Sequence, residues 1–228
     1  MSRAEKVEFL EQSEIRLMTR ECARVDGINL GQGICDLPTP PEVLDAASEA
    51  VQADLSVYSP YEGIPELREQ LAARLRRYNG LRRIDPDDGL ATTVGSTGAF
   101  ACTVQGLFNP GDELIVFEPY YGYHVNTMRV GGLSPSFVTL TPPDWQFTRE
   151  QLEDAITPHT RGVLVNTPTN PSGKVFGRDE LETIAEVCRD HDLLAVTDEI
   201  YEYIIYDDVE HVSLASLPGM WERAVTIS

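Results

Sequence analysis

Two polar side chains in the second half of the sequence lie where chemistry could occur: the amide of Asn170 and the carboxylate of Asp198. Asn170 belongs to a polar turn, Asn-Pro-Ser-Gly, that follows a short apolar run at 162–165, and Asp198 follows a second apolar run at 193–196. An amide donates and accepts hydrogen bonds and a carboxylate accepts them, so together they could bind a polar ligand. Taken alone, an aspartate after a strand is just as typical of a helix N-cap.

The segment between the two runs predicts a helix that brings both side chains to one edge of a sheet. Two apolar runs joined by a helix are typical of a βαβ unit with parallel strands. Parallel strands end on the same edge, and in open α/β sheets ligands bind beyond that edge. We therefore expect Asn170 and Asp198 to lie at a ligand-binding edge. The apolar residues that recur at helical spacing are Leu181, Ile184, Ala185 and Cys188.

The same segment resembles the large domain of fold-type I enzymes that use pyridoxal 5′-phosphate (PLP), in particular class I/II aminotransferases. The matching sequence segments are Asn170-Pro-Ser-Gly and Asp198-Glu-Ile-Tyr201. The resemblance implies that Asn170 and Tyr201 hydrogen-bond the phenolic oxygen of PLP and that Asp198 pairs with its pyridine nitrogen. PLP withdraws electrons best when this nitrogen is protonated, and a buried carboxylate favours the protonated form. Asp198 and Tyr201 are thus the expected catalytic residues.

A glycine-containing turn earlier in the chain has the features of an anion site. An expected strand at 90–94 leads into Gly95, Ser96 and Thr97, which open an apolar helix running to Leu107. Free N–H groups and the helix dipole attract an anion at such a helix start, and the two hydroxyls add donors. The glycine patterns of dinucleotide sites and phosphate loops are absent from the sequence, which disfavours a nucleotide-binding domain. The resemblance implies that Gly95, Ser96 and Thr97 hold the phosphate of PLP.

Three further residues acquire roles only through the resemblance. Tyr121, after an expected strand at 113–117, would stack on the PLP ring, although a cluster of tyrosines is also typical of a core. Tyr58, in the segment Tyr-Ser-Pro-Tyr-Glu-Gly-Ile-Pro-Glu-Leu-Arg, would reach across a homodimer to the partner subunit's PLP phosphate; core packing is its alternative. Gly33 would approach the substrate carboxylate with its backbone, or it is a plain turn glycine.

The composition narrows the class of protein. The 228 residues carry 37 acidic and 18 basic side chains, a formal charge of −19, which argues against nucleic acid or an anionic membrane as a partner. The sequence contains no run of eighteen apolar residues and no signal-peptide pattern. The four cysteines lie far apart without metal-ligand spacing, so we expect reduced thiols and no metal site. These features together predict a soluble cytoplasmic protein.

The whole pattern predicts a three-layer αβα fold with a mostly parallel sheet. We expect an N-terminal arm and small-domain segment at 1–45, and an incomplete PLP-binding large domain at 46–228. The other expected helices span 5–24, 42–53, 65–78 and 148–156, and the other expected strands span 136–140 and 224–227.

The lysine content limits what the chain could catalyse. Only Lys6 and Lys174 occur, and neither matches the family's Schiff-base lysine, which follows a strand like 224–227. We therefore expect the chain to cover somewhat more than half of such an enzyme and, as given, to be inactive. The expected reaction of the whole enzyme moves an amino group between an amino acid and a 2-oxo acid. A PLP-dependent carbon–sulfur lyase and a non-catalytic fragment or pseudoenzyme stay open as alternatives.

Overall fold

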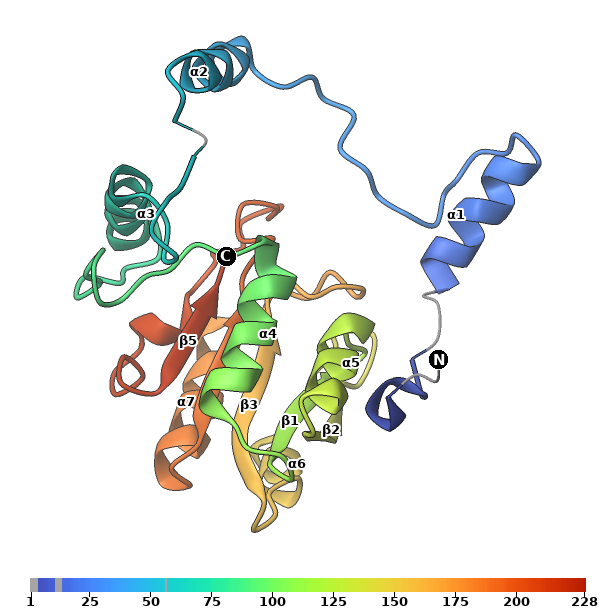
Figure 1. Ribbon diagram of the computed structural model, residues 1–228. Helices are drawn as coiled ribbons and strands as arrows, with labels where there is room; N and C mark the ends of the chain where they lie inside the picture. The colour runs from blue at the N-terminus through green and yellow to red at the C-terminus, as the bar shows by residue number, and fades with distance from the viewer. Residues whose placement is uncertain (1–3, 11–13, 56) are drawn as a thin grey trace.

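Parallel strands form a single sheet at the centre of the protein (Figure 1). The computed structural model describes residues 4–10, 14–55 and 57–228. The strands of this part of the chain are β1 (Glu113–Glu118), β2 (Ser134–Thr139), β3 (Thr160–Asn166), β4 (Leu194–Asp198) and β5 (Ala224–Ile227). They lie in the order β2-β1-β3-β4-β5, and each neighbouring pair is parallel.

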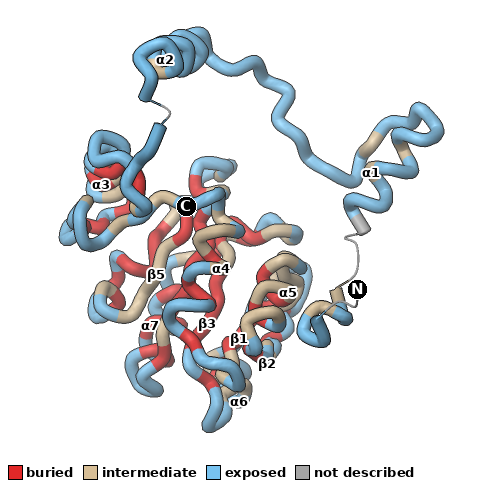
Figure 2. Tube along the Cα trace, in the orientation of Figure 1, coloured by how far each residue is buried: buried red, intermediate tan, exposed pale blue. Residues whose placement is uncertain are grey.

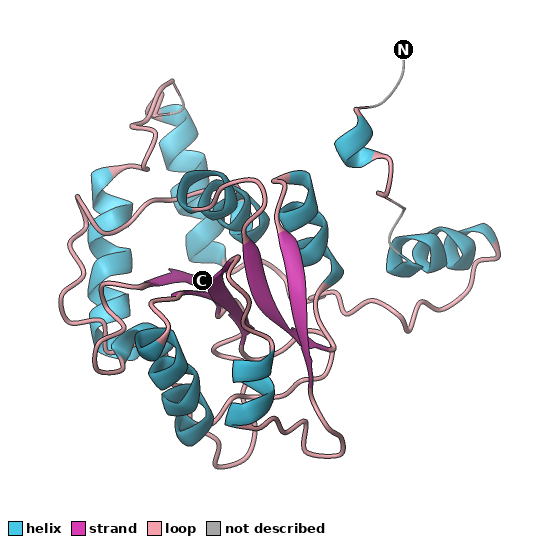
Figure 3. Cartoon of the chain, turned by 90° about the horizontal axis from the view of Figure 1, so that it is seen from below, coloured by secondary structure: helices cyan, strands magenta, loops and turns pink. Residues whose placement is uncertain are grey.

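Helices cover both faces of this sheet, which makes three layers (Figure 3). The covering helices are α4 (Gly95–Leu107), α5 (Gly122–Val130), α6 (Arg149–Asp154) and α7 (Arg178–Asp190). In β1, Leu114 and Val116 share a buried core with α4 and α5, whereas Ile115 and Phe117 share one with α6 and α7. Side chains alternate between the faces of a strand, so a strand buried on both faces is apolar throughout. The predicted three-layer αβα architecture is confirmed.

The predicted βαβ unit is present as β3, α7 and β4. The two strands pair in parallel, with Asn166 directly opposite Asp198. Helix α7 begins after Gly177, whose N–H donates a hydrogen bond to the carboxylate of Glu180 at 2.9 Å. Its apolar face is buried against the sheet as expected, through Leu181, Ile184, Ala185 and Cys188. The ends of β3 and β4 therefore deliver their polar residues to the same edge of the sheet.

The expected strand at 90–94 does not form, although the helix that follows it begins at Gly95 as predicted. Thr92 of this segment and Val225 of β5 both line one groove, and the described strand that pairs with β5 is β4. Pairing in a sheet needs neighbouring backbones roughly 5 Å apart, and here the Thr92 N–H instead donates to the Glu62 carbonyl at 2.8 Å. Within the described chain the segment has no strand to pair with, and the outer edge of β5 stays open.

The N-terminal part of the chain departs from the prediction in one place. The expected helix at 5–24 is instead a 3-10 turn, η1 (Glu5–Val7), and a helix, α1 (Glu14–Arg24), with residues 11–13 outside the described chain. Residues 8–10 are not helical; the ring of Phe9 lies 5.7 Å from the Arg129 guanidinium of α5, a tertiary contact that competes with the helical pattern.

The next two helices, α2 (Pro41–Gln52) and α3 (Pro65–Tyr78), match the predicted spans closely. Helices α1 and α2 lie away from the sheet and are largely exposed (Figure 2). Helix α3 packs through a small core of its own with η2 (Leu214–Ser216). None of the helices in the described chain has the length and apolar character that a membrane crossing needs.

Candidate functional site

The carboxylate of Asp198 is buried at the end of β4, where it needs partners. Its Oδ2 lies 2.8 Å from Nε2 of His124 on α5, and its Oδ1 accepts a hydrogen bond from the Ile200 N–H at 3.2 Å. The imidazole of His124 is also buried, and its ring lies 4.9 Å from the ring of Phe100 on α4. Two helices and a strand thus hold this carboxylate in one orientation.

Two asparagines, one at the end of β3 and one in the turn that follows, lie next to this group of residues. Nδ2 of Asn166 donates to the backbone carbonyl of Asp198 at 3.0 Å, and its Oδ1 accepts a hydrogen bond from the Asn170 N–H at 2.8 Å. The side-chain amide of Asn170 reaches instead towards Tyr201, with Nδ2 3.5 Å from the hydroxyl oxygen. The structure therefore brings Asn170, Asp198 and Tyr201 together at one edge of the sheet.

Tyr121 lies directly before α5 and adds an aromatic ring to this group. Its ring meets that of His124 edge-on, with centroids 5.3 Å apart and planes at 86°. Burial raises the pKa of the Tyr121 phenol above its ordinary value, and the neighbouring Tyr123 and Asp198 add to the rise. The phenol therefore stays neutral at physiological pH and offers an uncharged aromatic surface beside Asp198.

The start of α4 offers backbone N–H groups at the same edge. Gly95 adopts a φ of +67°, which turns the chain into the helix, and Val94 at the N-cap supplies no side-chain hydrogen bond. Ser96 and Thr97 follow in the first turn. Gly95 and Ser96 line the groove that also includes Ile200. A helix start without a side-chain cap leaves N–H donors and the positive end of the dipole available to an anion.

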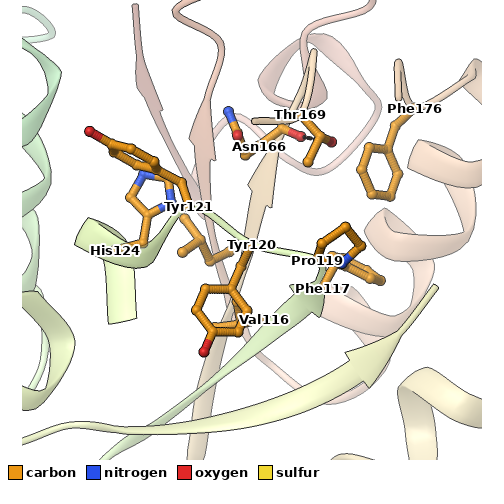
Figure 4. Close-up of a pocket in the computed structure, with 10 residues that line it drawn as sticks. Val116, Phe117, Pro119, Tyr120, Tyr121, His124, Asn166, Thr169 and Phe176 are labelled. Carbon is orange, nitrogen blue, oxygen red and sulfur yellow. Dashed lines mark hydrogen bonds between the residues drawn. The ribbon is translucent and has the colours of Figure 1, made fainter. Parts of the chain in front are cut away.

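An apolar pocket opens beside these groups (Figure 4). Tyr121 and His124 lie on one side of it, and Phe176 lies on the opposite side. Asn166 and Thr169 contribute the polar part of its wall. The pocket has a volume of only about 10 Å³, room for about one water molecule, so it borders the polar groups but is too small to hold a ligand itself.

Two predicted site residues lie elsewhere in this chain. Tyr58 is 97% exposed, and Gly33 belongs to an exposed loop where an added Cβ would have no atom within 4 Å. Among the described residues, neither forms part of the apolar pocket or of the groove along β5. Their expected contacts, with a partner subunit and with substrate, stay predictions.

Sequence reasoning does not single out His124 and Asn166, although both orient the site. His124 follows Tyr121 by three positions, so a helix beginning there puts the two rings on one side. Asn166 directly follows the apolar run 162–165, a strand-end position equivalent to that of Asp198. Two positions in the sequence could have identified these residues. Asn166 lies at a strand end, and His124 lies in the first turn of the helix that follows a strand.

The lysine amines of the described chain are not part of this group of residues. Nζ of Lys174 lies 2.6 Å from Oε1 of Glu180, and the lysine is 8% exposed. Its ammonium is therefore committed to an ion pair with the first turn of α7. Lys6 is exposed in η1.

The sequence matches one protein-family model along most of its length. That model describes aminotransferase class I and II, and it matches residues 25–226. Kynurenine–oxoglutarate transaminase 1 of Homo sapiens is 41% identical over 216 residues, which is 89% of this chain and 51% of that protein. The probable N-succinyldiaminopimelate aminotransferase of Mycobacterium tuberculosis is 38% identical over 213 residues, 92% of this chain and 53% of that protein. The chain thus spans about half the length of the curated relatives it matches.

Solved structures show the same relationship. The N-succinyldiaminopimelate aminotransferase from Mycobacterium tuberculosis superposes with a TM-score of 0.94 at 34% identity, covering 99% of this chain and 59% of that one. The aspartate aminotransferase from Thermus thermophilus with maleate superposes with a TM-score of 0.91 at 33% identity, with the same two coverages.

Proposed function

The chain belongs to the aminotransferase class I and II family, and we propose that it forms the cofactor-contacting portion of a PLP-dependent aminotransferase. The complete enzyme would move an amino group between an amino acid and a 2-oxo acid. The observation that carries this proposal is the buried Asp198 carboxylate, which is held by His124 beside the ring of Tyr121.

The residues at this edge fit the chemistry of PLP, which combines an aromatic ring, a protonatable ring nitrogen, a phenolic oxygen and a phosphate. Each part has a group of matching charge or hydrogen-bonding character in the described chain. The neutral ring of Tyr121 suits the aromatic ring, and the carboxylate of Asp198 suits the ring nitrogen. The Asn170 amide and the Tyr201 hydroxyl suit the phenolic oxygen, and the helix start at 95–97 suits the phosphate.

The chain's own residues would prepare the site for proton and electron movement. PLP, when bound, supplies a ring that withdraws electrons from the α-carbon of the substrate. Asp198 would keep a proton on the ring nitrogen, because a buried carboxylate stabilises a neighbouring cation. His124 would fix the direction of that carboxylate. Asn170 and Tyr201 would donate hydrogen bonds to the phenolic oxygen, and the start of α4 would bind the phosphate.

We also propose that the open edge of β5 receives chain that the relatives possess beyond the part matched here. Residues of β5 and of segment 90–94 both line the groove along this edge, and a strand inserted there could pair with both. On this proposal, segment 90–94 becomes a strand only when the sheet is completed. The division into an arm and small-domain segment at 1–45 and a large domain at 46–228 is likewise proposed, supported by the exposure of α1 and the loop after it.

A homodimer is the assembly that we propose, with Tyr58 reaching the partner subunit's PLP phosphate and Gly33 approaching the substrate. Support comes from the exposure of apolar side chains in the same part of the chain, since Ile28 is 86% and Leu30 is 92% exposed. Contiguous exposed apolar surface is typical of an interface. The proposed compartment is the cytoplasm, supported by the cysteines Cys22, Cys35, Cys102 and Cys188, all of which are free thiols.

The 228 residues alone are not expected to turn over substrate. Covalent attachment of PLP needs an amine at its aldehyde. Lys174 is held by Glu180, and Lys6 lies in the N-terminal turn. These positions support the prediction that neither lysine performs that attachment.

Amino-group transfer itself is tested in a form of the protein extended to the length of its relatives. With PLP, a panel of amino acids and 2-oxoglutarate, this form should release the 2-oxo acid of at least one amino acid. Asp198→Ala should lose at least about 100-fold in turnover, because preorganised electrostatic groups at a reacting centre contribute on that order. Near-normal turnover of Asp198→Ala would count against the assigned role, and absence of transfer with every amino acid would count against the reaction.

A further inference from the structure

The turn that carries Asp198 and Tyr201 also carries two buried carboxylates. Glu199 and Glu202 each directly follow one of these site residues, and they are 0% and 2% exposed. Buried ionised carboxylates are tolerated only with close partners. The partners of these two side chains therefore determine how firmly the turn is held.

Glu199 has a donor on each of its two oxygens. Oε1 accepts a hydrogen bond from Oγ of Ser213 at 3.0 Å, and Oε2 lies 3.0 Å from Nε2 of His211. The imidazole of His211 is 3% exposed, and its ring stacks at 6.4 Å from that of Tyr78 on α3. Both donors come from the segment that follows the turn, so Glu199 ties that segment to the end of β4.

Glu202 is joined to the same group from the side of α3. Nδ2 of Asn79 lies between the two carboxylates, 2.6 Å from Oε2 of Glu202 and 3.3 Å from Oε2 of Glu199. Oε1 of Glu202 accepts from Oγ of Ser228 at 2.7 Å and pairs with the guanidinium of Arg74. All four carboxylate oxygens are therefore satisfied by donors of the described chain.

The arrangement is built to hold a turn rather than a metal ion. The ligand atoms of Glu199, Glu202 and His211 lie within 4.8 Å of one another, a spacing that a cation could bridge. However, the Asn79 amide already donates to the two oxygens that such a cation would share. A cation at that place would have to displace these hydrogen bonds.

We infer that His211 is a positioning residue for Asp198 and Tyr201, an inference that rests on the proposed PLP site. The backbone transmits the restraint: the Glu202 N–H donates to the Glu199 carbonyl at 2.9 Å, and the Ile204 N–H donates to the Tyr201 carbonyl at 2.7 Å. The imidazole fixes Glu199, and Glu199 fixes the start of this turn. Without His211, the turn keeps its covalent path but loses one of the contacts that select a single orientation of Tyr201.

Hydrogen exchange of the 228-residue chain without ligand tests the structural half of this inference. In His211→Ala, the peptide 199–206 should exchange at least about tenfold faster, while the peptide 163–188 keeps its protection. His211→Gln should restore most of the protection, since its amide can donate to Glu199. His159→Ala is the matched control, because that imidazole is exposed.

An equal loss of protection in both peptides of His211→Ala would overturn the inference, because it would show a general loss of stability. An unchanged peptide 199–206 would overturn it too. If His211→Ala does not fold, Ser213→Ala removes the other donor to Glu199 and should give a smaller change with the same local pattern. The same two outcomes contradict the inference in that variant.

A double-mutant cycle tests the functional half, with pyridoxine 5′-phosphate as the probe because it lacks the aldehyde that reacts with lysines. Tyr201→Phe and His211→Ala should each weaken binding roughly fivefold, as expected for one lost hydrogen bond. If His211 acts through Tyr201, the loss of affinity in the double variant should be much smaller than the product of the losses in the two single variants.

Full multiplication of the two losses, about 25-fold, would contradict action through Tyr201. A wild-type chain that does not bind the probe would contradict the proposed PLP site instead, and the exchange experiment would still decide whether His211 holds the turn. The two failures are therefore distinguishable.

Discussion

Nε2 of His124 lies 2.8 Å from Oδ2 of Asp198, and both side chains are buried. The contact joins the first turn of α5 to the end of β4, which are 74 positions apart in the chain. A buried carboxylate that lacks a partner is costly, so His124 stabilises the fold and at the same time aims Asp198. The same pair is thus central to stability and to the proposed cofactor site.

Removal of the His124 imidazole should therefore affect both properties. His124→Ala should lower the free energy of unfolding by about 2 kcal/mol, because the Asp198 carboxylate loses a hydrogen bond inside the protein. His124→Gln keeps an N–H donor and should lose less. Urea unfolding measures the difference, with the exposed His159→Ala as the control. Equal stabilities of His124→Ala and the wild type would contradict the role of this contact.

The buried thiol of Cys188 should make stability fall at high pH. Burial raises the pKa of this thiol to about 12, whereas an unfolded cysteine ionises near 8.5. Between these values the folded chain keeps a proton that the unfolded chain has lost, so the free energy of unfolding should fall as pH rises above about 9. This one thiol should lower the free energy of unfolding by about 1.4 kcal/mol for each pH unit in that range. Cys188→Ala should show a shallower slope, and equal slopes would contradict the prediction.

Gly162 should be intolerant of even a methyl group. A Cβ added there would lie 2.8 Å from the Leu194 carbonyl oxygen of the neighbouring strand. Gly162→Ala should therefore cost about 1–3 kcal/mol through overpacking between β3 and β4. Gly106 on α4 is the matched control, since an added Cβ there meets no atom within 4 Å. Gly106→Ala should be neutral or stabilising, because alanine favours a helix. Chemical denaturation measures the free energy of unfolding of both variants. A Gly162→Ala variant as stable as the wild type would contradict the prediction, because it would show that β3 and β4 can move apart at little cost.

Neither lysine should become the attachment point of PLP in the 228-residue chain. Nζ of Lys174 is paired with Glu180, and Lys6 is exposed in η1, so any reaction with the aldehyde should be slow and non-selective. Borohydride reduction of the chain with equimolar PLP, followed by peptide mass spectrometry, measures the labelled fraction at each lysine. Stoichiometric labelling of Lys174 alone, together with amino-group transfer, would show that this lysine serves as the catalytic amine.

The sequence predicts the βαβ unit and its polar edge well because local patterns determine them. Apolar runs of strand length, a helix with one apolar face and polar residues shortly after each run predict the sheet edge at which Asn170 and Asp198 lie. The segment 90–94 has the composition of a strand but does not form one, because a strand exists only with a partner to pair with. The composition of a segment indicates its tendency to form a strand, but it does not show whether a neighbouring strand is present to pair with it.

The partners inside the site are harder to predict from the sequence. His124 and Asp198 are brought together by the packing of α5 on the sheet, and spacing along the chain does not reveal this. Glutamates are usually exposed, so the sequence alone does not predict that Glu199 and Glu202 are buried. Their burial depends on hydrogen-bond donors from the end of α3 and from the segment around His211. Tertiary contacts decide which acidic residues are buried.

In the proposed function, the carboxyl edge of the sheet binds PLP through Asp198. Titration of the 228-residue chain with pyridoxine 5′-phosphate, followed by the fluorescence of this compound, measures that binding. Asp144→Ala is the control because Asp144 is exposed. The wild type and Asp144→Ala should bind alike. Asp198→Ala should bind about tenfold more weakly, because it loses a hydrogen bond between charged groups and keeps the phosphate site. Equal affinities of Asp198→Ala and Asp144→Ala would contradict the proposed role of Asp198 in PLP binding.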